Sequence, residues 1–191
     1  MKGYNTKTDK ELMALLQKND SSALSELFER YCDQLNHFFY KLLGSNAMLA
    51  EDFVQELFIK IARSTHSFNA DYEVSSWMYS IAHNMVKNEY RKRSAKKRHG
   101  QHMELAFGET LVAHSNTEST VNQKLFSTEL SDLLLALDEE KRDLFLMRHY
   151  LGFSVKELSE IFEIPEGTVK SRVYHITQWL SERLKHYKNE L

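Results

Sequence analysis

The sequence predicts an all-α protein made of two small helical domains joined by a flexible acidic linker. The 191 residues include one proline and six glycines, too few turn residues for a many-stranded fold. Apolar residues recur at helical spacing along most of the chain. That spacing is lost from about residue 100 to residue 122, where Gly, Ser, Asn, Thr and Glu dominate. We therefore expect domains at 1–98 and 123–191, with a linker at 99–122.

Two helices are expected before Gly44. Thr8 and Glu11 have the spacing of a capping box, in which each side chain satisfies a backbone N–H at the start of a helix. The second helix begins near Asp20 and is strongly amphipathic, with apolar residues at steps of one, three and four. Gly44 suits the end of this helix, because glycine readily adopts the left-handed conformation that closes many helices.

Two further helices complete the first domain. One is expected at 47–64, with an apolar side and a polar side. A polar loop at 65–75 follows, and the next helix begins near Ser76. This helix has a polar stripe at steps of four, three and four, formed by Ser80, Asn84, Lys87 and Arg91.

The second domain is expected to contain four helices, of which the first two cover about 125–137 and 138–151. Gly152 ends the second of them. Ser154 then opens a third helix through another capping-box pattern. The only proline, Pro165, suits the first turn of the fourth helix, where no backbone N–H is needed. The last two helices therefore form a pair that meets at a sharp turn.

The last helix of this pair has two different sides. Its apolar seam, at helical spacing, consists of Val169, Val173, Ile176, Leu180 and Leu184. The opposite side carries Gly167, Ser171, Tyr174, His175 and Gln178, flanked by Lys170 and Arg172. A short capped helix, a tight turn and a longer helix with such a side suit insertion into the major groove of DNA. An ordinary helical hairpin with a solvated side has the same periodicity, so both interpretations stay open on that pattern alone.

Charge is segregated along the chain although the net charge is only −2. Residues 101–140 hold eight acidic residues and one lysine, whereas the stretch from Lys87 to Arg98 holds seven cations. Such a basic stretch repels itself unless it is solvated or faces phosphate. Aromatic residues near it could stack on unpaired bases. They are Phe68, Tyr72, Trp77, Tyr79 and Tyr90, of which Trp77 and Tyr79 could instead be core residues.

Nothing in the sequence indicates an enzyme, a metal site, a cofactor or a small-molecule substrate. The nine histidines form no H-E-x-x-H motif and no Cys/His pairing. There is also no glycine-rich phosphate loop. The one cysteine, Cys32, lies among apolar residues and is expected to be a buried structural thiol. Because no signal peptide or membrane-length apolar run is present, we expect a cytoplasmic location.

Three stretches of the chain resemble the extracytoplasmic-function (group IV) sigma factors of bacterial RNA polymerase. They are LFERYCDQLNHFFYKLLGSNAMLAEDFVQELFIKI, SSWMYSIAHNMVKNEYRKR and PEGTVKSR. The resemblance covers nearly the whole chain apart from the linker and the N-terminal tail. It implies an all-helical specificity subunit that brings core polymerase to promoters. A sigma region 2-like domain would then lie at 1–98 and a region 4-like helix-turn-helix domain at 123–191.

The resemblance also implies roles for individual residues. Asp52, Gln55 and Glu56 match the D-x-x-Q-E stretch that docks on the β′ clamp helices of core polymerase. The −10 promoter element would be recognised and opened by Phe68, Asn69, Asp71, Tyr72, Trp77, Asn84, Lys87, Asn88 and Arg91. Independently of the resemblance, the cations Lys87, Arg91 and Arg93 could hold the strand by its phosphates. The −35 element would be recognised by Thr168, Lys170, Ser171, Arg172, Tyr174 and His175. Two departures from the family pattern, Asn88-Glu89 in place of a common Asp and Ser159 in place of a common Ala, leave the class intact.

The expected partners are core RNA polymerase, through its β′ clamp helices and β flap, promoter DNA and an anti-sigma factor. The acidic linker is expected to thread toward the active-site cleft and the RNA exit channel. Two other classes stay open. A helix-turn-helix transcription activator, which needs another sigma factor, would leave the face around Asp52 and the central basic helix unexplained. A helical adaptor would bind protein only.

Overall fold

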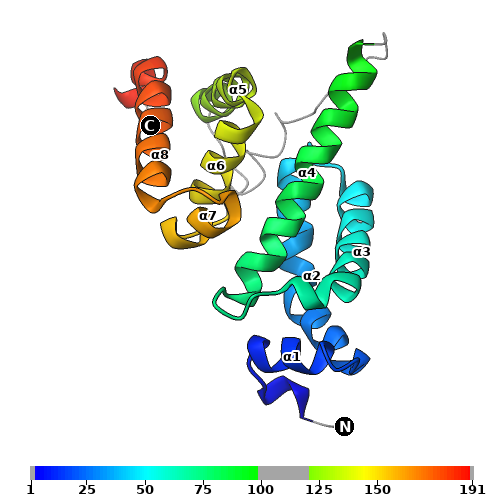
Figure 1. The fold of residues 1–191 in the computed structure, drawn as a ribbon. Coiled ribbons are helices and arrows are strands. Elements are labelled where there is room, and N and C mark those ends of the chain that lie inside the picture. Colours follow the sequence, from blue (N-terminus) through cyan, green and yellow to red (C-terminus); the bar gives the residue numbers. More distant parts are fainter. Residues whose placement is uncertain (1–2, 99–120, 190–191) are drawn as a thin grey trace. The chain divides into compact units, whose positions relative to one another are not determined.

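The computed structural model describes residues 3–98 and 121–189, and these residues contain helices and turns but no strand (Figure 1). The chain divides into two compact units, one built around the helices up to α4 and the other around α5 to α8. The all-α, two-domain prediction is therefore confirmed. The linker predicted at 99–122 lies almost entirely outside the described residues, so its boundaries stay predictions.

The first two helices begin where the sequence predicts, each with a side-chain cap. In α1 (Asp9–Leu16), the Thr8 hydroxyl accepts the Glu11 N–H at 3.3 Å, and the Glu11 carboxylate accepts the Thr8 N–H at 2.6 Å. In α2 (Ser21–Leu42), the Asp20 carboxylate accepts the Ser22 N–H at 3.1 Å. Gly44 follows α2 with a φ of 79°, the left-handed conformation that suits glycine.

The core of the first unit joins α2 to the two helices that follow it. These are α3 (Ala47–Ser64), capped by Asn46, and α4 (Val74–Arg98), which begins two residues earlier than predicted. Figure 1 shows α2, α3 and α4 side by side, with α1 across one end. Three edge-to-face ring pairs with centroids 4.9–5.3 Å apart hold α2 against its neighbours. They are Phe28–Phe58, Phe38–Tyr79 and Phe39–Phe53.

Helix α4 also closes the carboxyl end of α2. The last carbonyls of a helix have no partner within it. Here the buried Tyr90 hydroxyl donates to the Leu42 carbonyl at 2.7 Å, and Arg93 donates to the Leu43 carbonyl at 3.4 Å. Arg93 also pairs with Glu89 at 2.9 Å, and its side chain is only 14% exposed. Tyr79, Tyr90 and Arg93 are therefore packing residues. For Tyr79 this is the core alternative that the sequence left open, whereas the expectation that Tyr90 and Arg93 contact nucleic acid is wrong.

The described part of the second unit, residues 121–189, forms four helices and a final helical turn. They are α5 (Val121–Ala136), α6 (Glu139–His149), α7 (Val155–Phe162), α8 (Glu166–Arg183) and η3 (Lys185–Asn189). Asp138 caps α6, and the predicted capping box at Ser154 and Glu157 starts α7. Pro165 lies at the N-cap of α8, one position before the predicted first turn. α8 packs against α6.

The turn between α7 and α8 is fixed by hydrogen bonds around Ser159. Its hydroxyl donates to the Ile164 carbonyl at 2.6 Å, and its carbonyl accepts the Ile164 N–H at 3.1 Å. Between them Glu163 adopts a left-handed conformation with a φ of 55°. A non-glycine residue in this conformation is strained by about 1 kcal/mol. The two bonds to one residue offset that strain, so the start of α8 is set by Ser159.

Replacing Tyr90 by phenylalanine should destabilise the first unit by about 1–2 kcal/mol, because the buried Leu42 carbonyl loses its donor. Denaturant unfolding followed by circular dichroism measures this. Tyr72→Phe is the matched control, since Tyr72 is exposed and its hydroxyl removal should leave stability unchanged. Equal stability of the two variants would contradict the capping role of Tyr90.

Candidate nucleic-acid interface

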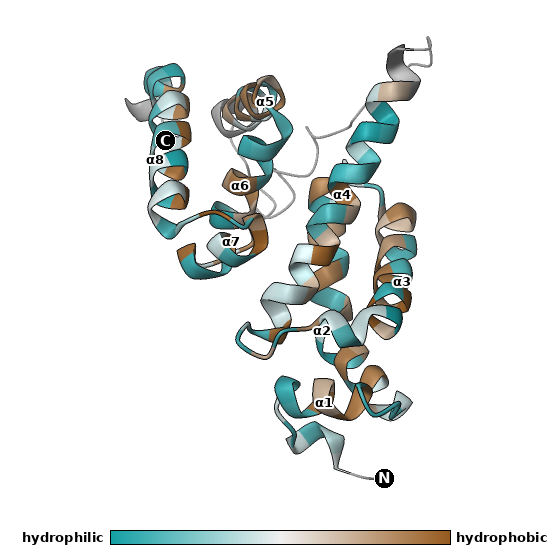
Figure 2. Ribbon diagram, in the orientation of Figure 1, coloured by the Kyte–Doolittle hydropathy of each residue, from teal (hydrophilic) through white to brown (hydrophobic). Residues whose placement is uncertain are grey.

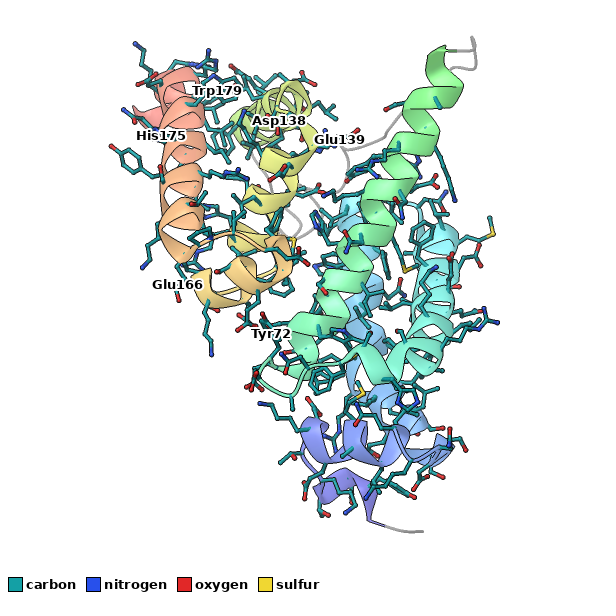
Figure 3. All side chains as sticks on the ribbon, in the orientation of Figure 1. Tyr72, Asp138, Glu139, Glu166, His175 and Trp179 are labelled. Carbon is teal, nitrogen blue, oxygen red and sulfur yellow. The ribbon has the colours of Figure 1, made fainter. Side chains whose placement is uncertain are left out.

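The outer side of α8 is polar and exposed. Val169, Ile176 and Leu180 are buried on the inner side, whereas Tyr174 is 62% exposed on the outer side. Figure 3 shows Glu166, His175 and Trp179 along this helix. Of the residues predicted to recognise the −35 element, Lys170, Ser171, Tyr174 and His175 are exposed and Thr168 is half-buried. Their hydroxyl, imidazole and ammonium groups can bond to base edges and phosphates in a major groove.

Arg172 pairs with another helix, whereas Lys170 pairs with Glu166 within α8 at 3.5 Å. The Arg172 guanidinium donates to the carboxylate of Glu140 in the first turn of α6, at 2.5 Å. The side chain still has 40% of its surface exposed, and an arginine has five N–H donors. Arg172 can therefore contact DNA with its remaining donors while Glu140 fixes its direction. The sequence did not predict this partner, which lies 32 residues away.

The loop before α4 is a compact turn built on Asn69. The Asn69 carbonyl accepts the Tyr72 N–H at 3.1 Å, and its side-chain oxygen accepts the Asp71 N–H at 3.0 Å. This turn leaves Asn69 and Asp71 exposed and Tyr72 47% exposed (Figure 3). Across the two ends of the loop, Phe68 and Trp77 are half-buried and meet edge to face at 5.4 Å. The loop thus offers one exposed ring, and a pair of half-buried rings joins its two ends.

A polar stripe runs along α4 from the end of this loop. Asn84, Asn88 and Arg91 are exposed and follow helical spacing, while Lys87 is half-buried beside them. Figure 2 shows the second half of α4 as mostly hydrophilic. The side chains of the last three cations of the basic stretch, Lys96, Lys97 and Arg98, lie outside the described residues. Amides and cations on one stripe can bind both the bases and the phosphates of a nucleic-acid strand.

The outer side of α3 has a different chemistry. Asp52, Gln55 and Glu56 are exposed there, as the sequence predicted for a polar side. Met48 and Ile59 are also exposed, by 73% and 51%, at the two ends of the same helical stripe. These two residues were not predicted from the sequence, although their spacing from Asp52 and Gln55 could have indicated them. Acidic groups between two exposed apolar side chains suit a protein partner rather than DNA.

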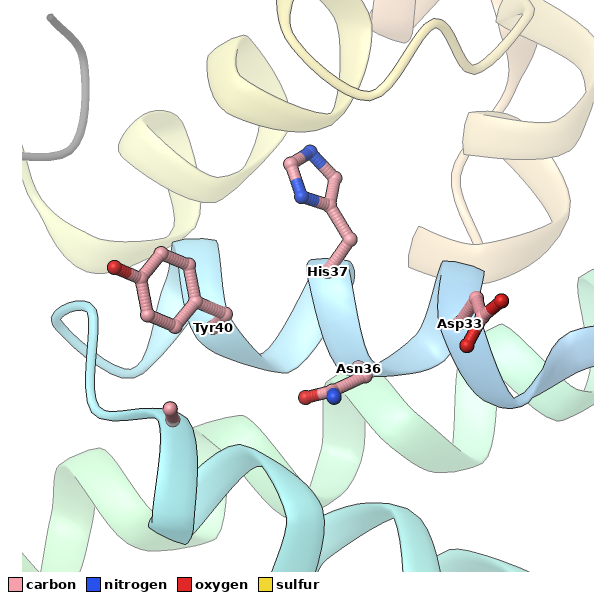
Figure 4. Close-up of a pocket in the computed structure, with 5 residues that line it drawn as sticks. Asp33, Asn36, His37 and Tyr40 are labelled. Atoms are coloured by element: carbon pink, nitrogen blue, oxygen red, sulfur yellow. The ribbon is translucent and has the colours of Figure 1, made fainter. Parts of the chain in front are cut away.

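A shallow groove of about 260 Å³ lies beside this face, between α2 and α3. Its lining consists of Phe28, Cys32, Asp33, Asn36, Glu51, Val54 and Gln55. Cys32 is therefore half-buried, whereas the sequence predicted a buried thiol. Its partial burial raises the pKa of the thiol. A second hollow of about 280 Å³ continues over Asp33, Asn36 and Tyr40 (Figure 4).

Two further properties concern the described residues as a whole. In the ranges 3–98 and 121–189, no three His, Cys, Asp or Glu side chains are placed to hold a metal ion together. Within the same ranges, no helix combines the length and the apolar character needed to span a bilayer.

Two family models match the chain. The model described as Sigma-70 region 2 matches residues 27–96, which include α3, the loop and most of α4. The model described as Sigma-70, region 4 matches residues 127–180, which include α6, α7 and most of α8. Together the two ranges span more than half of the 191 residues.

Curated relatives match along almost their full length. The ECF RNA polymerase sigma factor SigW of Bacillus subtilis (strain 168) is 28% identical over 183 residues, which is 92% of this chain and 96% of the relative. The ECF RNA polymerase sigma-E factor of Escherichia coli (strain K12) is 27% identical over 184 residues, with 93% and 95% covered.

Solved structures show the same fold at lower identity. CnrH, in complex with the cytosolic domain of CnrY, superposes with a TM-score of 0.65 at 19% identity, covering 93% of this chain and 97% of that one. The sigma factor RpoE, in complex with the anti-sigma factor NepR from Bartonella quintana, has a TM-score of 0.61 at 23% identity, covering 84% and 96%.

Proposed function

The chain belongs to the sigma-70 family and is of its extracytoplasmic-function type, and we propose that it directs core RNA polymerase to specific promoters and opens them. The observation that carries this proposal is the presence of three different outer faces on one chain. One is acidic with apolar ends, on α3, and two are polar and cationic, on α4 and α8. An activator with a helix-turn-helix would need only the last of them.

The α3 face is the proposed docking site for core polymerase. Asp52, Gln55 and Glu56 would contact the β′ clamp helices through hydrogen bonds and charge. Met48 and Ile59 would add apolar anchors at the two ends, since buried apolar side chains carry much of the energy of a protein interface. The second unit is proposed to contact the β flap of core polymerase.

The loop and α4 are the proposed site for opening the −10 element. Removing a base from its stack costs a few kcal/mol, and less is needed when the base enters a fitted pocket. Asn69, Asp71 and Tyr72 on the loop would hold such a base, together with the half-buried ring pair of Phe68 and Trp77. Asn84, Lys87, Asn88 and Arg91 would then bind the separated strand along α4.

The outer side of α8 is the proposed −35 reader. Lys170, Ser171, Tyr174 and His175 would enter the major groove, with Thr168 at the start of the helix and Arg172 held by Glu140. This domain would position the polymerase on the duplex, while α4 acts on the strands at −10. Binding by both parts should weaken as salt rises, because each phosphate contact releases counterions.

The remaining expectations belong to the same proposal. The acidic linker would occupy the path of the RNA toward the exit channel. The chain would act in the cytoplasm by binding alone, without catalysis or a cofactor. An anti-sigma factor would hold it inactive. The similar sigma factor RpoE was solved in complex with a partner of this kind, the anti-sigma factor NepR, which supports this expectation.

Replacing Tyr174 by alanine should weaken binding of the holoenzyme to a duplex −35 site by roughly tenfold or more, because a good base contact contributes about 1–3 kcal/mol. Lys170→Ala should instead reduce, by about one, the slope of the logarithm of affinity against the logarithm of salt concentration, because one phosphate contact is lost. Fluorescence anisotropy on a promoter selected by the wild-type holoenzyme measures both. Glu182→Ala, near the far end of α8, is the control. Unchanged duplex affinity in both variants would contradict the assignment of this face.

Core polymerase should protect Cys32 from alkylation, because this single cysteine lines the groove that also holds Glu51 and Gln55. In the free chain, Cys32 should be alkylated slowly, since burial raises the pKa of its thiol and the thiolate is the form that reacts. The alkylation rate should increase as the pH rises. Mass spectrometry of the labelled chain with and without core polymerase gives the two rates. Gln55→Ala with Glu56→Ala should reduce the protection.

The control for this protection is a cysteine placed elsewhere, through Lys18→Cys in a Cys32→Ser chain. Lys18 is exposed after the end of α1, and its label should be insensitive to core polymerase. An equal alkylation rate of Cys32 at saturating core polymerase would reject the α3 docking face.

A further inference from the structure

The N-terminal helix α1 contacts both ends of the segment that contains the proposed base-recognition loop. Gln17, directly after α1, donates its side-chain amide to the Thr65 carbonyl at 3.0 Å. The same carbonyl accepts the Phe68 N–H at 3.2 Å, which starts the loop. At the other end, Lys10 pairs with Glu73 at 3.3 Å, and Glu73 directly precedes α4. Two residues of one short segment therefore touch the start and the end of the loop.

This N-terminal segment is itself fixed to α2 by one arginine. Arg30 donates to the backbone carbonyls of Tyr4, Asn5 and Lys7 at 2.9–3.3 Å. It also pairs with Asp9 at 2.8 Å and with Glu26 at 2.9 Å. These ion pairs are only 16–28% exposed on their side chains, so they are better shielded from solvent than a surface pair.

A tyrosine on α2 adds a further bond to the same segment. The Tyr31 hydroxyl donates to the Asp9 carboxylate. Burial and this carboxylate raise the pKa of Tyr31, so its hydroxyl keeps its proton and stays a donor at neutral pH. The segment from Tyr4 to Gln17 is thus held to α2 through several strong donors. It can in turn hold the loop.

We propose that residues 4–17 form a brace that positions the loop at 68–73 for promoter opening, with Gln17 as its main positioning residue. The inference rests on the proposed opening role of that loop. Gln17 would touch no DNA. Its bond to the Thr65 carbonyl fixes where Phe68 begins the loop, so the loop is already ordered before a base arrives and less entropy is lost on capture.

Two features favour a positioning role over simple packing. Leu12, Met13 and Leu16 are buried and seat α1 on the core. Gln17 and Lys10 are not part of that apolar set, yet both reach the loop segment. The Lys10–Glu73 pair is exposed on both sides, so it contributes little compared with the partly buried Gln17 bond. Residues 4–17 also lie before the first residue matched by the region 2 family model, residue 27.

The test uses two substitutions of similar length. Gln17→Met removes the donor but keeps the shape, whereas Gln17→Lys restores an N–H donor. Permanganate reactivity of melted thymines is measured on full holoenzyme at a promoter that the wild-type holoenzyme selects. Gln17→Met should reduce the open fraction by roughly two- to tenfold, the range expected for one hydrogen bond. Gln17→Lys should recover most of it.

Four controls separate positioning from folding. Core-polymerase affinity and affinity for duplex −35 DNA should be unchanged in Gln17→Met. Its thermal midpoint should stay close to that of the wild type, because the Thr65 carbonyl keeps the Phe68 N–H as a partner. Lys18→Met, at the exposed neighbouring position, should open the promoter like the wild type. Normal opening by Gln17→Met, or a fall in opening matched by a fall in core affinity or thermal midpoint, would overturn the brace. If the wild-type holoenzyme itself opens no promoter, the proposed function fails and the brace fails with it.

Discussion

The proposed interfaces depend on the burial of one side of each helix. In α8, burying Val169, Ile176 and Leu180 contributes about 1.5–3 kcal/mol each. This energy fixes the rotation of the helix about its axis, because rotating the helix by one residue position would expose the apolar seam and bury polar groups. The side chains on the outer side are therefore held in known directions without packing of their own. The same constraint sets the outer sides of α3 and α4.

The ends of the helices are fixed by hydrogen bonds rather than by burial. Thr8 and Ser154 cap the starts of α1 and α7, while Tyr90 on α4 donates to the last carbonyl of α2. Ser159 fixes the turn that starts α8. Such bonds decide at which residue a helix begins, and this sets the position of every following residue along the helix axis. Burial and capping together place Tyr174 and the Asn69 turn in defined positions within their own units.

Local features of this structure were predictable from the sequence, and long-range contacts were not. Capping boxes and apolar seams need only neighbouring residues. The capping boxes of α1 and α7 were therefore predicted correctly, and so was the inner side of α8, although Val173 and Leu184 of its seam are only half-buried. The partners of Arg172 and Gln17 lie 32 and 48 residues away, beyond any periodic signal. Tyr90 and Arg93 stood within a basic, aromatic stretch that suggested nucleic acid. Their inward direction depends on how α4 packs against the end of α2, with partners 48 and 50 residues away, and no local pattern reveals that contact.

The most direct measurement adds the purified chain to core polymerase that lacks any sigma factor, on a library of promoter fragments, and sequences the 5′ ends of the transcripts. We predict defined start sites that share one pair of −35 and −10 motifs and that vanish without the chain. Start sites that appear only when another sigma factor is also present would identify an activator. Transcripts that are the same with and without the chain would contradict a role in promoter recognition.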